Sequence, residues 1–384
     1  MSKVIGLSEP HIFGNEYTYI KECLDTGWVS SAGKFVPLFE KSIADYTGSK
    51  HVVACVNATS ALHLSLRLLG VEANDEVIVP SLTFIAPINA IIYMGAEPVF
   101  MDSDAFCNIN IEKTLEFLIN ETEIRDDYSF NKNTGKRVKA ILPVHIFGNS
   151  VNLKELIIEC KKRNIKILED ASESLGSFYI DNLKKQNHTG TLGDIGCISF
   201  NGNKILTTGG GGVILTSSQY IAEKASYLSQ QAKDDPLNFV HNEVGYNYRL
   251  TNIQAAMGLA QMENVKEAVY RKKEIHDFYK ERLNLIAGLS MLDSPPYSNS
   301  NNWLSVLKVD SSKFKRGAGE IIKRLNDNQI QARPIWRANH LQKPFLEFSS
   351  YKIENIDRII KNYVCLPSGI SLTKEDLGRV VSNI

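Results

Sequence analysis

The sequence predicts an α/β protein whose central sheet is mostly parallel and carries helices on both faces, followed by a smaller α/β domain. The first reason is that residues 35–231 alternate between short apolar runs and segments with apolar residues at helical spacing. Strands that alternate with helices pair in parallel, because each helix returns the chain to the same end of the sheet. The second reason is that the alternation resumes on a smaller scale after Gly288 and Pro295-Pro296.

The chain of 384 residues is long enough to bury a large core and to form two domains. A long helix is predicted over residues 252–285, and we expect the domains to meet there. This gives a large domain of residues 1–265, with the N-terminal segment included, and a small domain of residues 266–384.

The elements of the large domain follow one another with short connections. Phe35, Leu38, Phe39 and Ile43 share one helix face, and Gly48 marks the end of that helix. Strands are predicted over 51–56, 76–79, 98–102, 138–144, 165–168 and 213–216, and the apolar run 196–200 precedes a glycine-rich loop. Helices are predicted over 35–46, 61–69, 111–120, 153–163 and 217–231, and a further helix with Pro87 in its first turn is predicted to end near Gly95. Residues 122–137 are expected to be an exposed excursion and residues 180–188 a polar insert.

The small domain is predicted to alternate in the same way. Its strands are expected over 302–309 and 330–335, and its helices over 318–328, 354–363 and from residue 373 onward.

Composition excludes several classes of protein. Lys plus Arg equals Asp plus Glu, 43 of each, so no overall charge favours nucleic acid or an anionic membrane. The six cysteines are scattered without a CxxC pair, which argues against a zinc site or a disulfide framework and favours a reducing cytoplasm. The first ten residues hold too short an apolar segment for a signal peptide. The uncharged stretch 77–96 contains prolines and is expected to be a buried strand, a turn and a buried helix.

Chemically useful side chains follow several predicted strands. These are Thr59, Phe84, His145, Asp170 and Lys204. Because the carboxyl ends of parallel strands meet along one edge of a sheet, we expect these residues to gather there. The acids Glu169-Asp170 at a strand end need a cationic partner, so a ligand contact is favoured over surface capping.

The segment Asn57-Ala58-Thr59-Ser60 lies between a strand and a helix. Free N–H groups of a first helical turn and the positive helix end attract an anion, and the two hydroxyls can add hydrogen bonds. An ordinary helix cap is the alternative use of such residues.

Lys204 lies between the apolar run 196–200 and the glycines Gly209 to Gly212. A lone lysine between buried strands is costly unless it is solvated, paired or used covalently. One interpretation is a surface hairpin; the other is a lysine that forms a Schiff base with a carbonyl cofactor. Pyridoxal phosphate is the cofactor that needs the other groups as well: a phosphate site at Thr59, Ser60 and Ser199, a carboxylate for the ring nitrogen at Asp170, and a stacking ring at Phe84.

At these residues the chain resembles the DegT/DnrJ/EryC1/StrS aminotransferases, which are sugar-modifying members of the fold type I pyridoxal phosphate enzymes. The resemblance runs from about Gly14 to the end of the chain. The matching motifs are Asn57-Ala58-Thr59-Ser60-Ala61-Leu62, Thr83-Phe84, Pro143-Val144-His145, Glu169-Asp170, Gly193-Asp194-Ile195-Gly196, Ser199-Phe200-Asn201-Gly202-Asn203-Lys204, Gly245-Tyr246-Asn247-Tyr248-Arg249-Leu250 and Cys365-Leu366-Pro367-Ser368.

The resemblance implies a role for each matching residue. Lys204 would bond to the cofactor and act as acid and base, Asp170 would pair with the ring nitrogen, and Glu173 would contact the ring hydroxyl. Thr59, Ser60 and Ser199 would hold the phosphate. Asn247 would reach the phosphate of a partner subunit, so that a homodimer shares its active sites. Trp28, Ser30 and Ser31 resemble a segment that lines the sugar site.

The sequence departs from common patterns of this family at Gly210, Pro87 and Ala58, and the first two departures leave the substrate subclass open. The sequence around Lys204 most resembles that of family members that aminate C4 of nucleotide-linked 2-acetamido-2,6-dideoxy-hexos-4-uloses. The implied reaction converts a UDP- or GDP-linked 4-keto-6-deoxy sugar to the 4-amino sugar, with glutamate as donor, for surface polysaccharide.

Three alternatives stay open at this point. One is amination at C3, and another is a cofactor-dependent sugar dehydratase, against which Lys204 argues because such members tend to have histidine there. The third is a non-catalytic binding or regulatory protein with the same fold. A P-loop at the glycines is excluded, because no Gly-Lys-Ser/Thr follows them.

Overall fold

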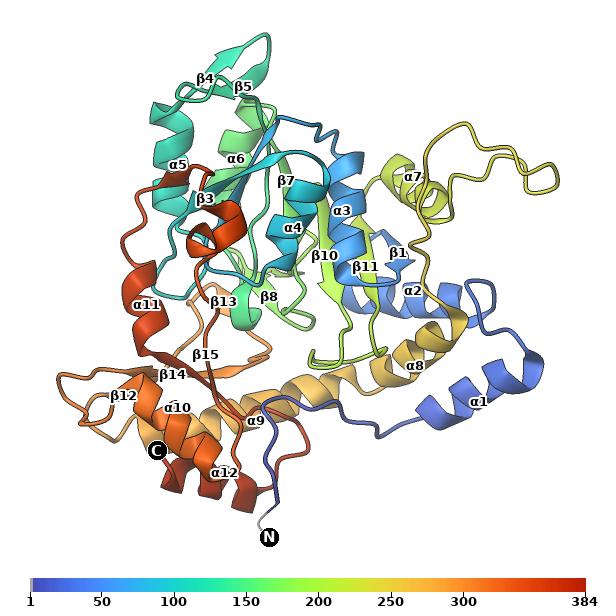
Figure 1. Cartoon of the computed structure of the whole chain (residues 1–384). Coiled ribbons are helices and arrows are strands. Elements are labelled where there is room, and N and C mark those ends of the chain that lie inside the picture. Colours follow the sequence, from blue (N-terminus) through green and yellow to red (C-terminus); the bar gives the residue numbers. More distant parts are fainter. Residues whose placement is uncertain (1–2) are drawn as a thin grey trace.

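The computed structural model describes residues 3–384, so Met1 and Ser2, with which the predicted large domain begins, lie outside the described residues. Its main feature is an eight-stranded sheet in the order β1-β11-β10-β7-β6-β2-β3-β16 (Figure 1). Only β11 runs against the others in this sheet, so the mostly parallel sheet predicted from the sequence is confirmed. The strands are β1 His51–Cys55, β2 Glu76–Pro80, β3 Glu97–Met101, β6 Val138–Ile141, β7 Lys166–Asp170, β10 Ile195–Ser199, β11 Gly212–Thr216 and β16 Ser350–Tyr351.

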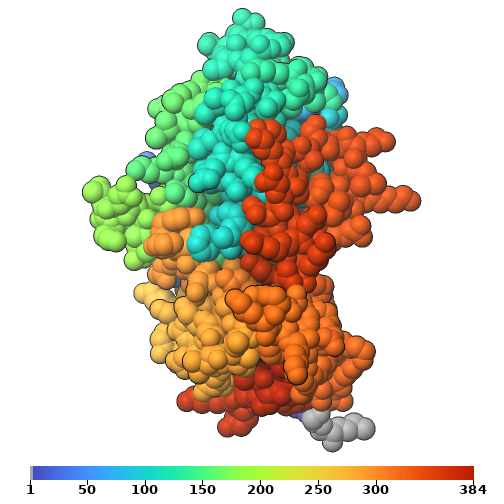
Figure 2. Space-filling view, turned by 90° about the vertical axis from the view of Figure 1, so that its left-hand side faces the viewer, coloured from blue at the N-terminus to red at the C-terminus, as the bar shows by residue number. Residues whose placement is uncertain are grey.

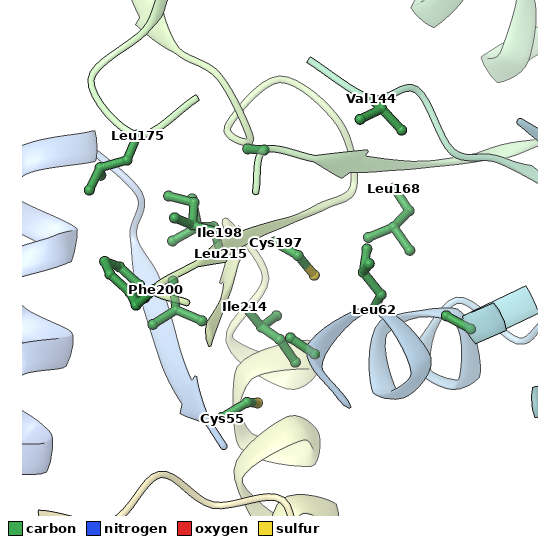
Figure 3. Packing of buried hydrophobic residues seen from close by; sticks show 14 of the residues in the cluster. Cys55, Leu62, Val144, Leu168, Leu175, Cys197, Ile198, Phe200, Ile214 and Leu215 are labelled. Atoms are coloured by element: carbon green, nitrogen blue, oxygen red, sulfur yellow. The ribbon is translucent and has the colours of Figure 1, made fainter. Parts of the chain in front are cut away.

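Helices cover both faces of this sheet, because successive side chains of each strand point to opposite sides. In β2, Val77 and Val79 face the core that contains α3, whereas Ile78 faces a second core with α5 and α6. Figure 3 shows part of the first core, in which Leu62 of α3 lies near Leu168 and Cys197 of the sheet. The helices of this part are α1 Glu16–Thr26, α2 Phe35–Thr47, α3 Ala58–Leu68, α4 Ala86–Tyr93, α5 Ile111–Asn120, α6 Lys154–Lys162 and α7 Gln219–Ser229, with the 3-10 turn η1 Ile146–Gly148.

A smaller antiparallel sheet, in the order β12-β14-β17-β15, lies at the other end of the molecule. It packs with the end of α9 (Val265–Leu283) and with α10 and α12 around a separate core, which also takes in Ile5 through a bridge to Ile330. Its elements are β12 Leu289–Met291, β14 Ser305–Val309, β15 Arg333–Pro334, β17 Tyr363–Leu366, α10 Ala318–Asp327 and α12 Lys374–Ser382.

Between β15 and β17 the chain leaves the small sheet and lies on the large one. Figure 2 shows this orange-red segment running along the cyan part of the molecule. It forms η2 Asn339–Leu341, η3 Lys343–Phe345, β16 and α11 Ile356–Asn362, and β16 pairs with the edge strand β3. The segment therefore connects the small sheet to the β3 edge of the large sheet.

Three sequence-based expectations differ from the structure. The single helix predicted over 252–285 is two helices, α8 Asn252–Met262 and α9 Val265–Leu283. The break falls at Glu263-Asn264, where the Glu263 carboxylate accepts hydrogen bonds from Asn15 (2.7 Å) and Tyr19 (2.5 Å) of the N-terminal segment. No glycine or proline marks this break, so apolar periodicity could not reveal it.

Two polar segments for which no strands were predicted form hairpins, and residues 122–137 are exposed over much of their length, as expected. Within 122–137, β4 Thr122–Arg125 pairs with β5 Tyr128–Asn131, and the buried Asn131 amide donates to Glu76 Oε2 at 2.8 Å. Within 180–188, β8 Phe178–Ile180 pairs with β9 Gln186–His188, and β13 Ser298–Asn299 adds a third strand.

The end of the helix predicted over 354–363 is the third difference. Tyr363 begins β17 instead of ending a helix, and the four residues of that strand complete the small sheet. In the described part of the chain, no helix combines the length and apolarity that crossing a membrane requires.

Candidate active site

The carboxyl ends of β2, β7 and β10 open into one cavity of about 450 Å³. Six of the predicted site residues line it: Thr59, Phe84, Asp170, Glu173, Ser199 and Lys204. They come from four separate strand or loop ends of the large sheet, as the gathering of parallel strand ends predicts. The cavity is closed from the other side by residues of the small sheet and its connections, among them Trp303, Arg333 and Trp336.

Lys204 projects into this cavity from the turn after β10. Its Nζ lies 3.8 Å from Glu173 Oε1 and 4.0 Å from the centroid of the Trp303 ring. Burial lowers the pKa of Lys204, and the charges of Glu173 and Asp170 oppose this effect. A lowered pKa favours the neutral amine, which is the form of lysine that can act as a nucleophile toward a carbonyl group.

Two carboxyl groups face Lys204. Asp170, at the end of β7, accepts the N–H of Ser172 at 2.9 Å, and burial raises its pKa despite that bond and the nearby Lys204. Glu173 accepts the N–H of Phe147 at 2.8 Å, and burial raises its pKa to about 7, with Lys204 acting against the rise. Perturbed carboxyl and amine groups in one cavity are typical of a site that moves protons.

An anion site lies at the beginning of α3. The Asn57 side chain caps the helix by accepting the N–H of Ser60 at 2.8 Å, so the earlier N–H groups of the turn are left for another partner. A Cβ added at Gly212 would come within 2.5 Å of the nitrogen of Ala58, so only glycine lets β11 pass this close to the helix start. The Thr59 and Ser199 side chains line the same part of the cavity. A phosphate group suits this position, because it meets free N–H groups and the positive helix end.

The structure does not bring every predicted residue to this cavity. Ser60 is buried, is used in the cap and is not part of the cavity wall. Asn247 and Ser31 line a different cavity of about 280 Å³, together with Lys233 and Arg249. Trp28 is 58% exposed, and its carbonyl and that of Ser30 accept hydrogen bonds from Asn252 at 2.7 Å and 2.6 Å.

The predicted strand-end residue His145 and the acid Glu169 are also absent from the cavity. Both are fully buried, and His145 Nε2 lies 2.9 Å from Glu169 Oε2. The expectation that both acids of Glu169-Asp170 contact a ligand is therefore wrong for Glu169. Successive residues of a strand face opposite sides, so only one of two neighbours can reach the cavity.

Several cavity residues were missed by reasoning from the sequence, namely Ser172, Asn201, Asn203, Trp303, Arg333 and Trp336. Ser172 is two residues after Asp170, and its position next to a predicted site residue was an available signal. Trp303, Arg333 and Trp336 belong to the other end of the chain, where no local pattern pointed to the cavity.

These groups fit pyridoxal phosphate. The cavity holds an amine for an aldehyde, a buried carboxyl for a ring nitrogen, and a helix start for a phosphate, all from residues of this chain.

Comparison with known proteins shows the family of the chain. The family model of the DegT/DnrJ/EryC1/StrS aminotransferases matches residues 10–384. The chain is 35% identical to a GDP-perosamine synthase of Caulobacter vibrioides over 98% of this chain and 96% of that protein. It is 34% identical to a GDP-perosamine synthase of Escherichia coli O157:H7, over 90% of this chain and 88% of that protein.

The fold agrees as well. The solved structure of the aminotransferase TlmJ from Streptoalloteichus hindustanus superposes with a TM-score of 0.87 and 27% identity, covering 99% of this chain and 98% of that one. The cavity, the fold and the full-length match together lead to one conclusion. This chain belongs to the DegT/DnrJ/EryC1/StrS aminotransferase family and is a pyridoxal phosphate-dependent sugar aminotransferase.

Proposed function

We propose that the enzyme transfers an amino group from glutamate to C4 of a UDP- or GDP-linked 4-keto-6-deoxy sugar, of the 2-acetamido-2,6-dideoxy-hexos-4-ulose type, for surface polysaccharide. The observation that carries the proposal is Lys204 in one cavity with Asp170, Glu173 and the start of α3. The relatives named GDP-perosamine synthase support a nucleotide-linked amino sugar as product. We also expect the enzyme to work in the cytoplasm, where its nucleotide-linked substrate would be made.

The cavity residues divide the work of such a transfer. When bound, the cofactor supplies a carbonyl carbon that takes up the amine and a ring that withdraws electrons. Asp170 would keep the ring nitrogen protonated, and Thr59, Ser199 and the N–H groups at the start of α3 would hold the phosphate. The Lys204 amine would move the proton between the two carbons on either side of the transferred nitrogen. Phe84, which is 54% exposed, offers a ring to cover the cofactor.

The three departures from common family patterns bear on the substrate. Ala58, Pro87 and Gly210 all line the Lys204 cavity. They are therefore in a position to change the shape of the sugar site while the groups for the chemistry stay in place. This supports a distinct sugar as substrate within the same reaction.

The assignment of Lys204 as the lysine that bonds to the cofactor is tested by borohydride reduction of the purified enzyme, followed by peptide mapping. We expect the cofactor mass on Lys204, and its presence on another lysine would overturn the assignment. The Lys204→Ala variant is expected to lose turnover by at least about 10³-fold, because nucleophile and proton carrier are the same group. Multiple-turnover transamination by that variant would contradict the proposal.

The substrate is tested with a small panel of keto sugars that vary in nucleotide, keto position and 2-substituent. The expected product carries an amino group at C4, seen by mass and NMR, with 2-oxoglutarate formed in equal amount. A product aminated at C3, or one that has lost a hydroxyl group instead of gaining nitrogen, would replace this proposal by the corresponding alternative activity.

We further propose that two copies share their active sites. Asn247 and Ser31 lie in their own cavity with the cationic Lys233 and Arg249, apart from the Lys204 cavity of the same chain. A second copy would carry Asn247 to the phosphate, and Trp28, Ser30 and Ser31 to the sugar.

Mixed dimers test this sharing. Lys204→Ala and Asn247→Ala chains are each expected to be weak, whereas a mixed dimer contains one site with both native residues and regains activity. If the two residues act within one chain, mixing restores nothing. Light scattering on the same samples reports whether dimers form.

A further inference from the structure

Trp303 contacts the Lys204 amine and belongs to a group of three stacked rings with Trp336 and Phe147. The Lys204 Nζ lies 4.0 Å from the centroid of the Trp303 ring, which is within the range of a cation–π contact. Trp303 itself is buried, with 2% of its surface exposed. An ammonium group over an indole face gains most when it is largely desolvated, and only 13% of the Lys204 side chain is exposed.

The indole ring is bonded directly to the backbone that carries the lysine. Trp303 Nε1–H donates to the carbonyl of Asn203, the residue before Lys204, at 2.7 Å. The Trp303 ring therefore contacts both the backbone next to Lys204 and the Lys204 amine, so that the turn and the ring hold each other in place. A buried indole N–H needs an acceptor, and here the acceptor belongs to the backbone segment that carries the lysine.

The backbone of Trp303 is held as well. Its N–H donates to the Asn301 side chain at 2.9 Å, and the same side chain donates to the carbonyls of Glu173 at 2.9 Å and Leu175 at 2.8 Å. The Trp303 carbonyl accepts a hydrogen bond from the buried Lys272 at 2.9 Å. Asn301 thus links the tryptophan to the loop of Glu173, the carboxyl group beside Lys204.

Two further rings keep the indole from turning. Trp336 stacks on Trp303 with centroids 6.2 Å apart and planes at 13°, and Phe147 lies 6.5 Å away at 23°. Phe147 and Trp336 stack on each other at 5.0 Å. Rotation of the Trp303 ring would break both stacks and the bond to Asn203.

We propose that Trp303 is a positioning residue for Lys204: its indole face holds the free lysine ammonium whenever that lysine is not bonded to the cofactor. This rests on the proposed function in one respect, namely that Lys204 is the lysine that bonds to the cofactor. The ring favours the protonated amine and keeps it within reach of the cavity between the two halves of the transfer. The other charged groups at the amine are Glu173 and Asp170, and Arg333 lines the same cavity.

The test is competitive labelling of lysine amines with acetic anhydride across pH, followed by peptide mass mapping, on the full-length chain freed of cofactor. It reports the pKa of Lys204 whether or not the enzyme turns over, with exposed Lys184 as internal reference. Trp303→Leu keeps an apolar wall but removes the ring, so the pKa of Lys204 is expected to fall by about 1 unit. Trp303→Phe, which keeps a weaker ring face, is expected to give less than half of that shift.

Trp336→Leu is the matched control, because Trp336 lines the same cavity and stacks on Trp303, whereas the Lys204 amine lies over the Trp303 ring. It is expected to move the pKa of Lys204 by less than about 0.2 units. An unchanged pKa in Trp303→Leu, or an equal fall in Trp336→Leu, would overturn the proposal. If Trp303→Leu does not fold, the Trp303→Phe shift decides, and no shift there overturns it.

Kinetics give a second measurement. Trp303→Phe is expected to lower kcat with little change in the KM of the keto sugar, because the ring acts on the lysine and not on the substrate. A rise in KM at constant kcat would instead make Trp303 a substrate contact. Failure of the borohydride test on Lys204 removes the proposed function, whereas a labelled Lys204 with an unmoved pKa removes only this inference.

Discussion

Glu169 and Asp170 are neighbours at the end of β7, but their side chains differ in surroundings. Glu169 is bonded inside the protein, whereas Asp170 lines the Lys204 cavity. Glu169 Oε1 accepts the N–H groups of Leu192 at 2.7 Å and Gly193 at 2.6 Å, and Oε2 accepts that of Gly190 at 3.0 Å and contacts His145. Although burial alone would raise it, the pKa of Glu169 is held below its ordinary value by His145 and these N–H groups.

Asp170 has fewer partners. The hydrogen bonds from Ser172 and the charge of Lys204 do not outweigh burial, so its pKa is raised. The difference teaches that a buried acid becomes part of a reactive site when the fold leaves its charge incompletely compensated and open to a cavity. A fully bonded buried acid instead stabilises the loop around it.

The largest effect is expected for substitution of Asp170, the acid that lines the Lys204 cavity. Asp170→Asn removes the group that can keep a ring nitrogen protonated, so kcat is expected to fall by at least about 10²-fold. The melting temperature of the cofactor-free chain is expected to stay the same or rise, since an incompletely compensated buried carboxyl is lost. Steady-state kinetics and thermal unfolding check both parts. A kcat within tenfold of the native value would show that the compared acids do not differ in catalysis.

The opposite outcome is expected for Glu169. Glu169→Ala leaves His145 and three N–H groups without an acceptor, which is expected to cost about 3–5 kcal/mol of unfolding free energy. The folded fraction is expected to keep nearly native kcat. Urea denaturation and active-site titration separate the two quantities, with Glu169→Gln as the milder variant. A stable Glu169→Ala chain with lost activity would reverse the comparison.

The smallest effect concerns pH. Glu173 has a raised pKa of about 7 in the folded chain, so the folded state binds its proton more tightly than the unfolded state does. This contribution to stability is complete below the ordinary glutamate pKa and is lost as pH rises through about 7. The cofactor-free native chain is therefore expected to lose stability between about pH 5 and 8, and Glu173→Gln to flatten that slope.

Thermal unfolding at a series of pH values measures this slope. Identical slopes for the native chain and Glu173→Gln would mean that Glu173 is compensated in the way Glu169 is. Among the three acids, only Asp170 would then be incompletely compensated, and Glu173 would be grouped with Glu169.

Local sequence predicted most of the large sheet. The strands β1, β2, β3, β7 and β11 appear within two residues of their expected ends, because each is an apolar run bounded by turn residues. The gathering of Asp170, Phe84, Thr59 and Lys204 followed from the parallel sheet. The position of His145 did not, since a strand-end rule places a residue at an edge and says nothing of the face toward which it points.

What the sequence determined alone was the alternation of strands and helices, the edge where they end, and the lysine, acid and hydroxyl groups at that edge, because these depend on neighbours a few residues apart. Tertiary structure alone decided that Glu169 is bonded away from the cavity, that Asn247 lies outside it, and that Trp303, Arg333 and Trp336 close it. The partners of Glu169 lie 21 to 24 positions away in the chain, whereas the residues that close the cavity come from far along it, as in the Trp303–Asn203 bond, which joins residues 100 positions apart. Only the packing of the small sheet and its connecting segment on the large one brings them together.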